Sequence, residues 1–108
     1  MLHYEISGDS NQTLVLLHGV MESTEVWYDM LPELEKHFRI IRIDLPGHGK
    51  SETIAEVQTM ELMAAGVKNT LKDLVNGKIH LLGHSMGGYV SLAYAEMYPE
   101  DLQSITLF

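Results

Sequence analysis

The sequence predicts an α/β fold in which a mostly parallel sheet carries helices on both faces. Apolar stretches of strand length alternate with amphipathic stretches of helix length along the 108 residues. Connections of helix length imply parallel strands joined by right-handed crossovers. No repeat, linker or change in composition divides the chain, so residues 1–108 are expected to form a single domain.

The first two strands are expected at residues 2–7 and 14–17. Apolar and polar residues alternate over the first stretch, which is typical of a strand with one exposed face. The Gly-Asp-Ser-Asn cluster at 8–11 then indicates an edge strand that ends in a hairpin-like reversal. Residues 14–17 are continuously apolar, as expected of a strand that is covered on both faces.

The next segment, residues 25–36, has apolar residues at helical spacing, and Ser23 or Thr24 is available as its cap. Pro32 lies inside this window and predicts two short turns rather than one regular helix. A β-branched stretch at 38–43 is the expected third strand, and a loop rich in proline and glycine follows it.

The helix with the clearest pattern is expected between Ile54 and Asn76, with Gly77 ending it. Its apolar positions, three or four residues apart, are Met60, Met63, Val67, Leu71 and Leu74. The remaining elements are a buried strand at 79–82, a helix at 86–98 that Pro99 ends, and a last strand at 102–108.

The composition excludes several classes of protein. Fifteen acidic and seven basic residues give a formal charge of -8, and the basic residues form no patch, so nucleic acid would be repelled. There is no cysteine for disulfides or thiolate chemistry. No signal peptide is visible, and no apolar run approaches the roughly 18 residues of a membrane span. A soluble, cytoplasmic protein without a membrane partner is therefore expected.

In sheets of this kind, ligands bind beyond the carboxyl ends of the strands. At one such end lies a G-x-S-x-G motif, residues 83–88, between an expected strand and an expected helix. Side chains at Gly83 and Gly87 would collide with the neighbouring strand and helix, and Ser85 would be held out at the tip of a strained turn. The N–H of Met86 could then meet an oxyanion formed beside Ser85. The alternative is that Ser85 only caps the helix, because the bare motif also occurs by chance.

Two further loops follow expected strands. They are His-Gly-Val-Met at 18–21 and a D-x-P-G-H-G-x-S segment at 44–51. Together with residues 83–88 they resemble the signatures of the α/β-hydrolase superfamily, most closely its small esterase, peptidase and menaquinone-synthesis (MenH-like) members. The resemblance covers essentially the whole chain. It implies that the strands lie in the order first, third, second, fourth, fifth, with the first one antiparallel.

The resemblance also implies roles for individual residues. Ser85 would be the nucleophile, and the backbone N–H groups of Val20 and Met86 would form the oxyanion hole. His84 is expected to point away from the serine, and His18 to be a structural hydrogen-bonding residue. The supporting positions of the matching motifs are His18, Gly19, Gly83, His84, Gly87 and Gly88.

A serine at this position favours acyl transfer, since members that act on haloalkanes or epoxides use an aspartate. The expected substrate is a small molecule with an ester, amide or thioester group. The superfamily places an acid and then a histidine after the serine, but none of the six histidines follows Ser85. The chain is therefore expected to be the amino-terminal part of a serine hydrolase, an incomplete α/β-hydrolase fold that lacks the carboxyl-terminal strands and is a poor catalyst alone.

No cofactor or metal is expected. The Gly-Lys-Ser segment at 49–51 resembles the end of a phosphate-binding loop, but Asp44 stands where that loop needs a glycine. His80 and His84 have the spacing of metal ligands on a helix, but they straddle a strand and a turn.

An interpretation from a different class is a binding module without catalysis. Its apolar terminal strand, 102–108, would present an unpaired edge to a second copy or to a complementing carboxyl-terminal fragment.

Overall fold

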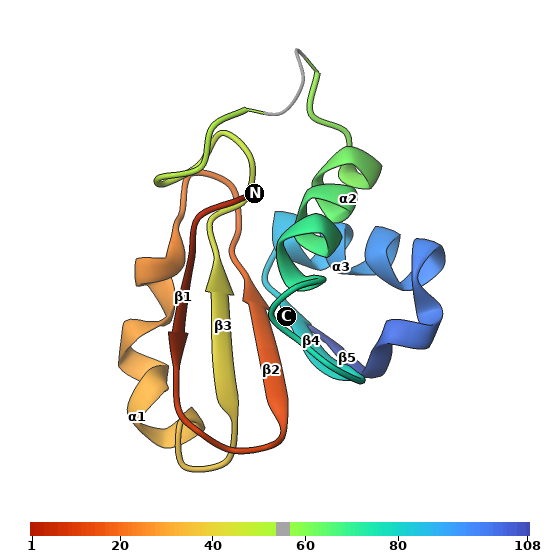
Figure 1. The fold of residues 1–108 in the computed structure, drawn as a ribbon. Helices are drawn as coiled ribbons and strands as arrows, with labels where there is room; N and C mark the ends of the chain where they lie inside the picture. The colour runs from red at the N-terminus through yellow and green to blue at the C-terminus, as the bar shows by residue number, and fades with distance from the viewer. Residues whose placement is uncertain (54–56) are drawn as a thin grey trace.

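A five-stranded sheet with helices on both faces forms the fold (Figure 1). The computed structural model describes residues 1–53 and 57–108. The strands are β1 (Tyr4–Ser7), β2 (Thr13–Leu17), β3 (Arg39–Ile43), β4 (Ile79–Gly83) and β5 (Leu102–Leu107). They lie in the order β1-β3-β2-β4-β5, in which β1 is antiparallel to β3 and the other pairs are parallel. The predicted fold class, strand order and direction of the first strand are confirmed.

Helical segments cover both faces of the sheet. The 3-10 helix η1 (Thr24–Met30) and helix α1 (Leu31–Leu34) lie on one face, and α2 (Met60–Leu71) and α3 (Met86–Met97) lie on the other (Figure 1). A short 3-10 helix, η2 (Pro99–Asp101), leads into β5. No helix within residues 1–53 or 57–108 has the length and apolar character needed to cross a membrane.

Strand β2 shows why both faces must be covered. All five of its residues are buried. Val15 and Leu17 belong to the core beneath α2 and α3, whereas Leu14 and Leu16 pack with Trp27 on the opposite face. An apolar strand of this kind is stable only between two helical layers, because successive side chains point to opposite faces.

The second to fifth strands and the helix predicted at 86–98 are found with their ends within one residue of expectation. The first strand begins two residues later than expected, and α1 ends two residues before the expected end of the segment 25–36. The segment around Pro32 forms two short helical pieces, as predicted. Ser23 is the cap of the first piece, and its hydroxyl accepts the N–H of Glu25 at 3.3 Å.

Helix α2 is shorter than predicted. It begins after Thr59, whose hydroxyl accepts an N–H of the first turn, and it ends at Leu71. Leu74 still packs against the core, but it lies in the turn that follows the helix. The prediction that Gly77 ends the helix is therefore wrong, and residues 54–56 of the predicted window lie outside the described residues.

Strand β1 is an edge strand, as predicted, and the chain reverses direction after it, because β1 is antiparallel to β3 and β2 is parallel to β3. The reversal is not a paired hairpin, since β1 pairs with β3 and not with β2. Both edges of β2 are already occupied by β3 and β4. The chain leaves β1 through Gly8, which has a φ of 78° and where a Cβ would overlap the carbonyl oxygen of Phe38. Only glycine fits this crossing without strain.

Candidate active site

A sharp turn at the end of β4 places Ser85 immediately before α3. Its backbone has φ 55° and ψ -117°, a conformation that side-chain-bearing residues rarely adopt. The carbonyl oxygen of Ser85 accepts the N–H groups of Gly88 at 2.8 Å and Tyr89 at 3.3 Å, so the helix begins directly after it. The hydroxyl is exposed and makes no capping bond to α3. Ser85 therefore stands at the N-cap position of α3, but its side chain does not cap the helix.

Two glycines make this turn possible. A Cβ at Gly83 would overlap the carbonyl group of Gly87, and a Cβ at Gly87 would overlap the carbonyl group of Leu17 at the end of β2. The predicted collisions at both positions are confirmed. Gly88 differs, because a Cβ there would meet its nearest neighbour, the carbonyl oxygen of Gly83, at an ordinary contact distance of 3.6 Å.

The turn after β2 passes beside the serine. A Cβ built on Gly19 would lie 3.2 Å from the Cβ of Ser85. The N–H of Gly19 donates to Glu22, whereas the N–H groups of Val20 and Met86 have no acceptor among the residues that the structure describes. The structure thus brings Gly19 and Ser85 together and leaves the two predicted oxyanion amides unpaired.

His18 links this turn to the loop after β3. The ring is fully buried, and its Nε2 accepts the N–H of Leu45 at 2.9 Å. The proton of the ring must therefore be on Nδ1, which donates to the carbonyl oxygen of Gly19 at 2.7 Å. Burial lowers the pKa of His18 below its ordinary value, so the ring is neutral at pH 7.

The loop after β3 is held by a buried carboxylate. Asp44 accepts the N–H of Thr24 at 2.8 Å and the N–H of Lys50 at 2.9 Å. A Cβ at Gly49 would overlap this carboxylate, which explains the glycine at that position. Leu45 follows Asp44 and donates its N–H to His18, which belongs to the turn beside Ser85. By holding the loop after β3, the carboxylate of Asp44 therefore also holds this donor in place.

Glu22 is a site residue that the sequence analysis missed. Its Oε1 accepts the N–H of Gly19 at 2.6 Å and lies 3.2 Å from Nδ1 of His84. Burial tends to raise the pKa of Glu22, but the hydrogen bonds from Gly19 and His84 outweigh it and lower the pKa below its ordinary value. The only local signal was a carboxylate three residues after a glycine in a turn, where side chains can accept a backbone N–H.

None of the histidines in the described ranges hydrogen-bonds to the hydroxyl of Ser85. His84 faces Glu22 and packs edge-on against Phe108 with ring centroids 5.6 Å apart. His80 lies at the start of β4, where it contacts Ser104 at 2.7 Å and Gln12 at 2.9 Å. No three acidic or histidine side chains within residues 1–53 and 57–108 are grouped to hold a metal ion.

Ser85 opens onto an apolar hollow of about 390 Å³ between α3 and the end of β5. Large exposed side chains form most of its wall. The lining residues besides Ser85 are Gly88, Tyr89, Leu92, Leu107 and Phe108. A hollow of this size is sufficient for a small molecule next to the hydroxyl.

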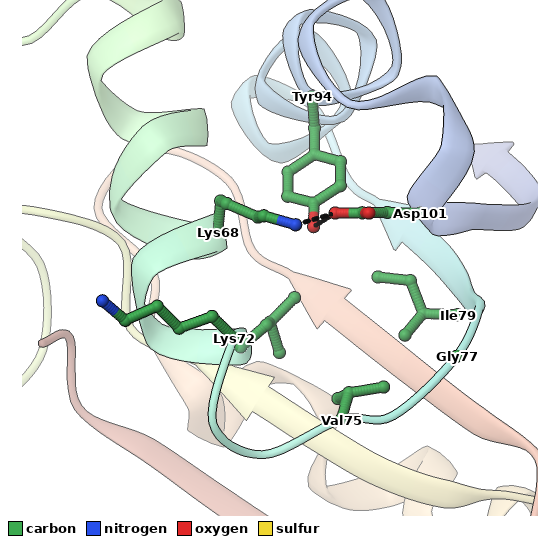
Figure 2. Close-up of a pocket in the computed structure, with 8 residues that line it drawn as sticks. Lys68, Lys72, Val75, Gly77, Ile79, Tyr94 and Asp101 are labelled. Atoms are coloured by element: carbon green, nitrogen blue, oxygen red, sulfur yellow. Dashed lines mark hydrogen bonds and ion pairs between the residues drawn. The ribbon is translucent and has the colours of Figure 1, made fainter.

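A second hollow of about 200 Å³ lies between α2, α3 and the start of β4 (Figure 2). Lys68 and Tyr94 both point toward Asp101, at 2.6 Å and 2.8 Å from its Oδ2 (Figure 2). Burial and the contact with Asp101 raise the pKa of Tyr94 above its ordinary value, so the phenol remains a donor. These groups satisfy one another and join α2 to α3 and η2, which is a structural role.

Comparisons with known proteins identify the fold family of the chain. The family model of the alpha/beta hydrolase fold matches residues 12–108. The 2-hydroxy-6-oxononadienedioate/2-hydroxy-6-oxononatrienedioate hydrolase of Escherichia coli is 35% identical over 111 residues, which are 98% of this chain and 38% of that protein.

Solved structures of esterases have a similar fold. A thermophilic esterase from Thermogutta terrifontis is 40% identical, with a TM-score of 0.85 over 98% of this chain and 39% of the esterase. A marine microorganism esterase is 27% identical, with a TM-score of 0.93 over 98% of this chain and 40% of that chain. The chain thus spans about two fifths of the length of these relatives.

The glycine geometry predicts opposite effects for two neighbouring substitutions. Gly83→Ala should destabilise the fold by about 3 kcal/mol or more, because the new methyl group overlaps helix backbone that cannot move away. Gly88→Ala should be neutral or stabilising by up to about 1 kcal/mol, because alanine favours the helix and its Cβ would make only ordinary van der Waals contacts, the nearest at 3.6 Å. Denaturant unfolding of both variants measures the difference, and equal effects would contradict the steric account.

Proposed function

The chain belongs to the α/β-hydrolase fold family, and on that premise we propose that it carries the nucleophile and the oxyanion hole of a serine hydrolase. The observation that carries this proposal is an exposed hydroxyl on a strained turn, flanked by segments with two backbone amides that have no acceptor within residues 1–53 and 57–108. The substrate class is a small molecule with an ester, amide or thioester group.

The proposed reaction is acyl transfer to Ser85. The hydroxyl oxygen attacks the carbonyl carbon while a base takes its proton, and the carbonyl oxygen becomes an oxyanion. The N–H groups of Val20 and Met86 donate to that oxyanion, with the amino end of α3 adding a favourable dipole. Collapse breaks the bond to the leaving group, which takes the proton from the base and departs as an alcohol, amine or thiol. Water then attacks the acyl group while the base takes a proton from it, and the base returns that proton to the oxygen of Ser85 as the carboxylic acid is released.

The base and the acid of this reaction are proposed to come from polypeptide outside these 108 residues. Two facts support this: no histidine follows Ser85 in the sequence, and the chain spans about two fifths of the length of its relatives. Removal of the triad of a serine protease lowers turnover on the order of a millionfold, although oxyanion stabilisation preserves some rate above water. The 108-residue chain should therefore be a weak catalyst alone.

The hollow beside Ser85 supports a substrate with an apolar acyl or leaving group. Tyr89 and Leu92 of α3 face it on one side, and Leu107 and Phe108 on the other. Among the relatives above, two are named as esterases, which supports an ester as the first substrate to test.

Hydrolysis of p-nitrophenyl acetate tests the proposal. The chain should release p-nitrophenol slowly but above the buffer rate, with acetyl transferred to Ser85, and Ser85→Ala should lose both the extra rate and the adduct. Ser104→Ala is the matched control, because Ser104 is exposed and contacts His80 but lies away from the elbow. Equal rates for the parent chain and Ser85→Ala would remove the case for a nucleophile here.

A second candidate function is docking to another chain through β5. This strand pairs only with β4, and its other edge has no partner among the described residues. Ile105, Leu107 and Phe108 are 37%, 49% and 62% exposed. An uncharged apolar edge of this kind favours strand addition by a second copy or by a complementing carboxyl-terminal fragment.

This candidate predicts that the chain self-associates as its concentration rises. Ile105→Lys should shift the chain toward monomer, because a charge on an edge strand opposes pairing. Val26→Lys, at an exposed apolar position on η1, is the control and should leave association unchanged. Light scattering over a concentration series measures this, and a monomer at every concentration would exclude docking between copies.

A further inference from the structure

We propose, as an extension of the acyl-transfer function above, that Glu22 is a positioning residue that sets the oxyanion hole by binding the N–H of Gly19 and tying the turn after β2 to the turn before α3. Glu22 belongs to neither the nucleophile motif nor the pair of amides assigned to the oxyanion. Its role is inferred from the contacts of one carboxylate oxygen.

The first contact closes the turn on itself. Oε1 of Glu22 accepts the N–H of Gly19 at 2.6 Å, and the N–H of Glu22 donates to the carbonyl oxygen of Gly19 at 3.3 Å. Two bonds between the same residues thus hold the backbone on both sides of Val20.

The second contact joins this turn to the nucleophile elbow. The same Oε1 lies 3.2 Å from Nδ1 of His84, the residue before Ser85. The backbone N–H of His84 also donates to the carbonyl oxygen of Leu17 at 3.0 Å. A shift of Glu22 would therefore move the two halves of the oxyanion hole relative to each other.

These contacts matter because the turn contains a strained residue, which must be held in place, and several backbone N–H groups that could turn toward the oxyanion. Met21 has a φ of 63°, which persists only where its surroundings enforce it. Glu22 takes the N–H of Gly19, whereas the N–H groups of Val20 and Met21 have no acceptor among the described residues. Without the carboxylate, the strained turn could relax and the N–H of Gly19 would itself be unpaired.

The carboxylate acts by accepting hydrogen bonds and not by its charge. A negative charge near a developing oxyanion opposes it, so the benefit must come from geometry. Glu22→Gln keeps the length of the side chain and an acceptor oxygen, whereas Glu22→Asp keeps the charge but is too short for both contacts. Comparison of these two variants therefore shows whether the position of the acceptor oxygen or the negative charge of the side chain is required.

The experiment compares Glu22→Ala, Glu22→Asp and Glu22→Gln with the parent chain. Glu25→Ala is the control for the loss of one negative charge, because the Glu25 side chain is exposed and has no hydrogen bond or ion pair with the described residues. The first readout is the rate at which p-nitrophenyl acetate acetylates Ser85. The second is hydrogen exchange of the Gly19 amide by NMR, and thermal unfolding of each variant verifies that it is folded.

The alanine and aspartate variants should acetylate about tenfold more slowly, and their Gly19 amide should exchange faster. The glutamine variant should recover most of the rate and the protection, and Glu25→Ala should match the parent chain. Acetylation of Glu22→Ala at the parent rate, or failure of glutamine to rescue a folded variant, would overturn the role of Glu22. If the parent chain itself is not acetylated, the proposed function fails. The hydrogen-exchange rate of the Gly19 amide then tests Glu22 separately, because an unchanged rate in Glu22→Ala would exclude Glu22 as the residue that holds the turn.

Discussion

The site depends on the close approach of two backbones, the first turn of α3 and the end of β2. A Cβ at Gly87 would overlap the carbonyl group of Leu17, and a Cβ at Gly83 would overlap that of Gly87. Only glycine permits this contact, which forces the strained conformation of Ser85 and exposes its hydroxyl. The turn after β2 then lies beside the serine because it continues directly from the strand that α3 contacts.

The fold was predictable where the signal is local in the chain. Apolar periodicity located the strands and α3, and the resemblance to α/β-hydrolases supplied the strand order that the structure confirms. The end of α2 was not predictable from periodicity, since Leu74 contributes to the apolar core from a turn. The local pattern alone does not identify the neighbour of β1, because its pairing with β3 depends on which edges of the sheet are already occupied; the resemblance supplied it.

The candidate site, like the fold, was predictable where its contacts are local in the chain. The requirement for Gly83 could be predicted locally, because its Cβ would overlap Gly87 of the same motif. The requirement for Gly87 came from the motif alone, since the carbonyl group that its Cβ would overlap belongs to Leu17 of β2, far away in the sequence. The link between Glu22 and His84 could not be predicted, since it joins residues 62 positions apart and a lone glutamate in a loop usually indicates a solvated charge. The proton position on His18 is likewise set by the N–H of Leu45, a contact that only the folded chain creates.

The most direct test of the account is a crystal structure of the chain after reaction with a fluorophosphonate, whose phosphonyl oxygen imitates the oxyanion. The account predicts a covalent bond to the hydroxyl oxygen of Ser85, with the phosphonyl oxygen at hydrogen-bonding distance from the amide nitrogens of both Val20 and Met86. An adduct on another residue, or a phosphonyl oxygen that contacts neither amide, would contradict it.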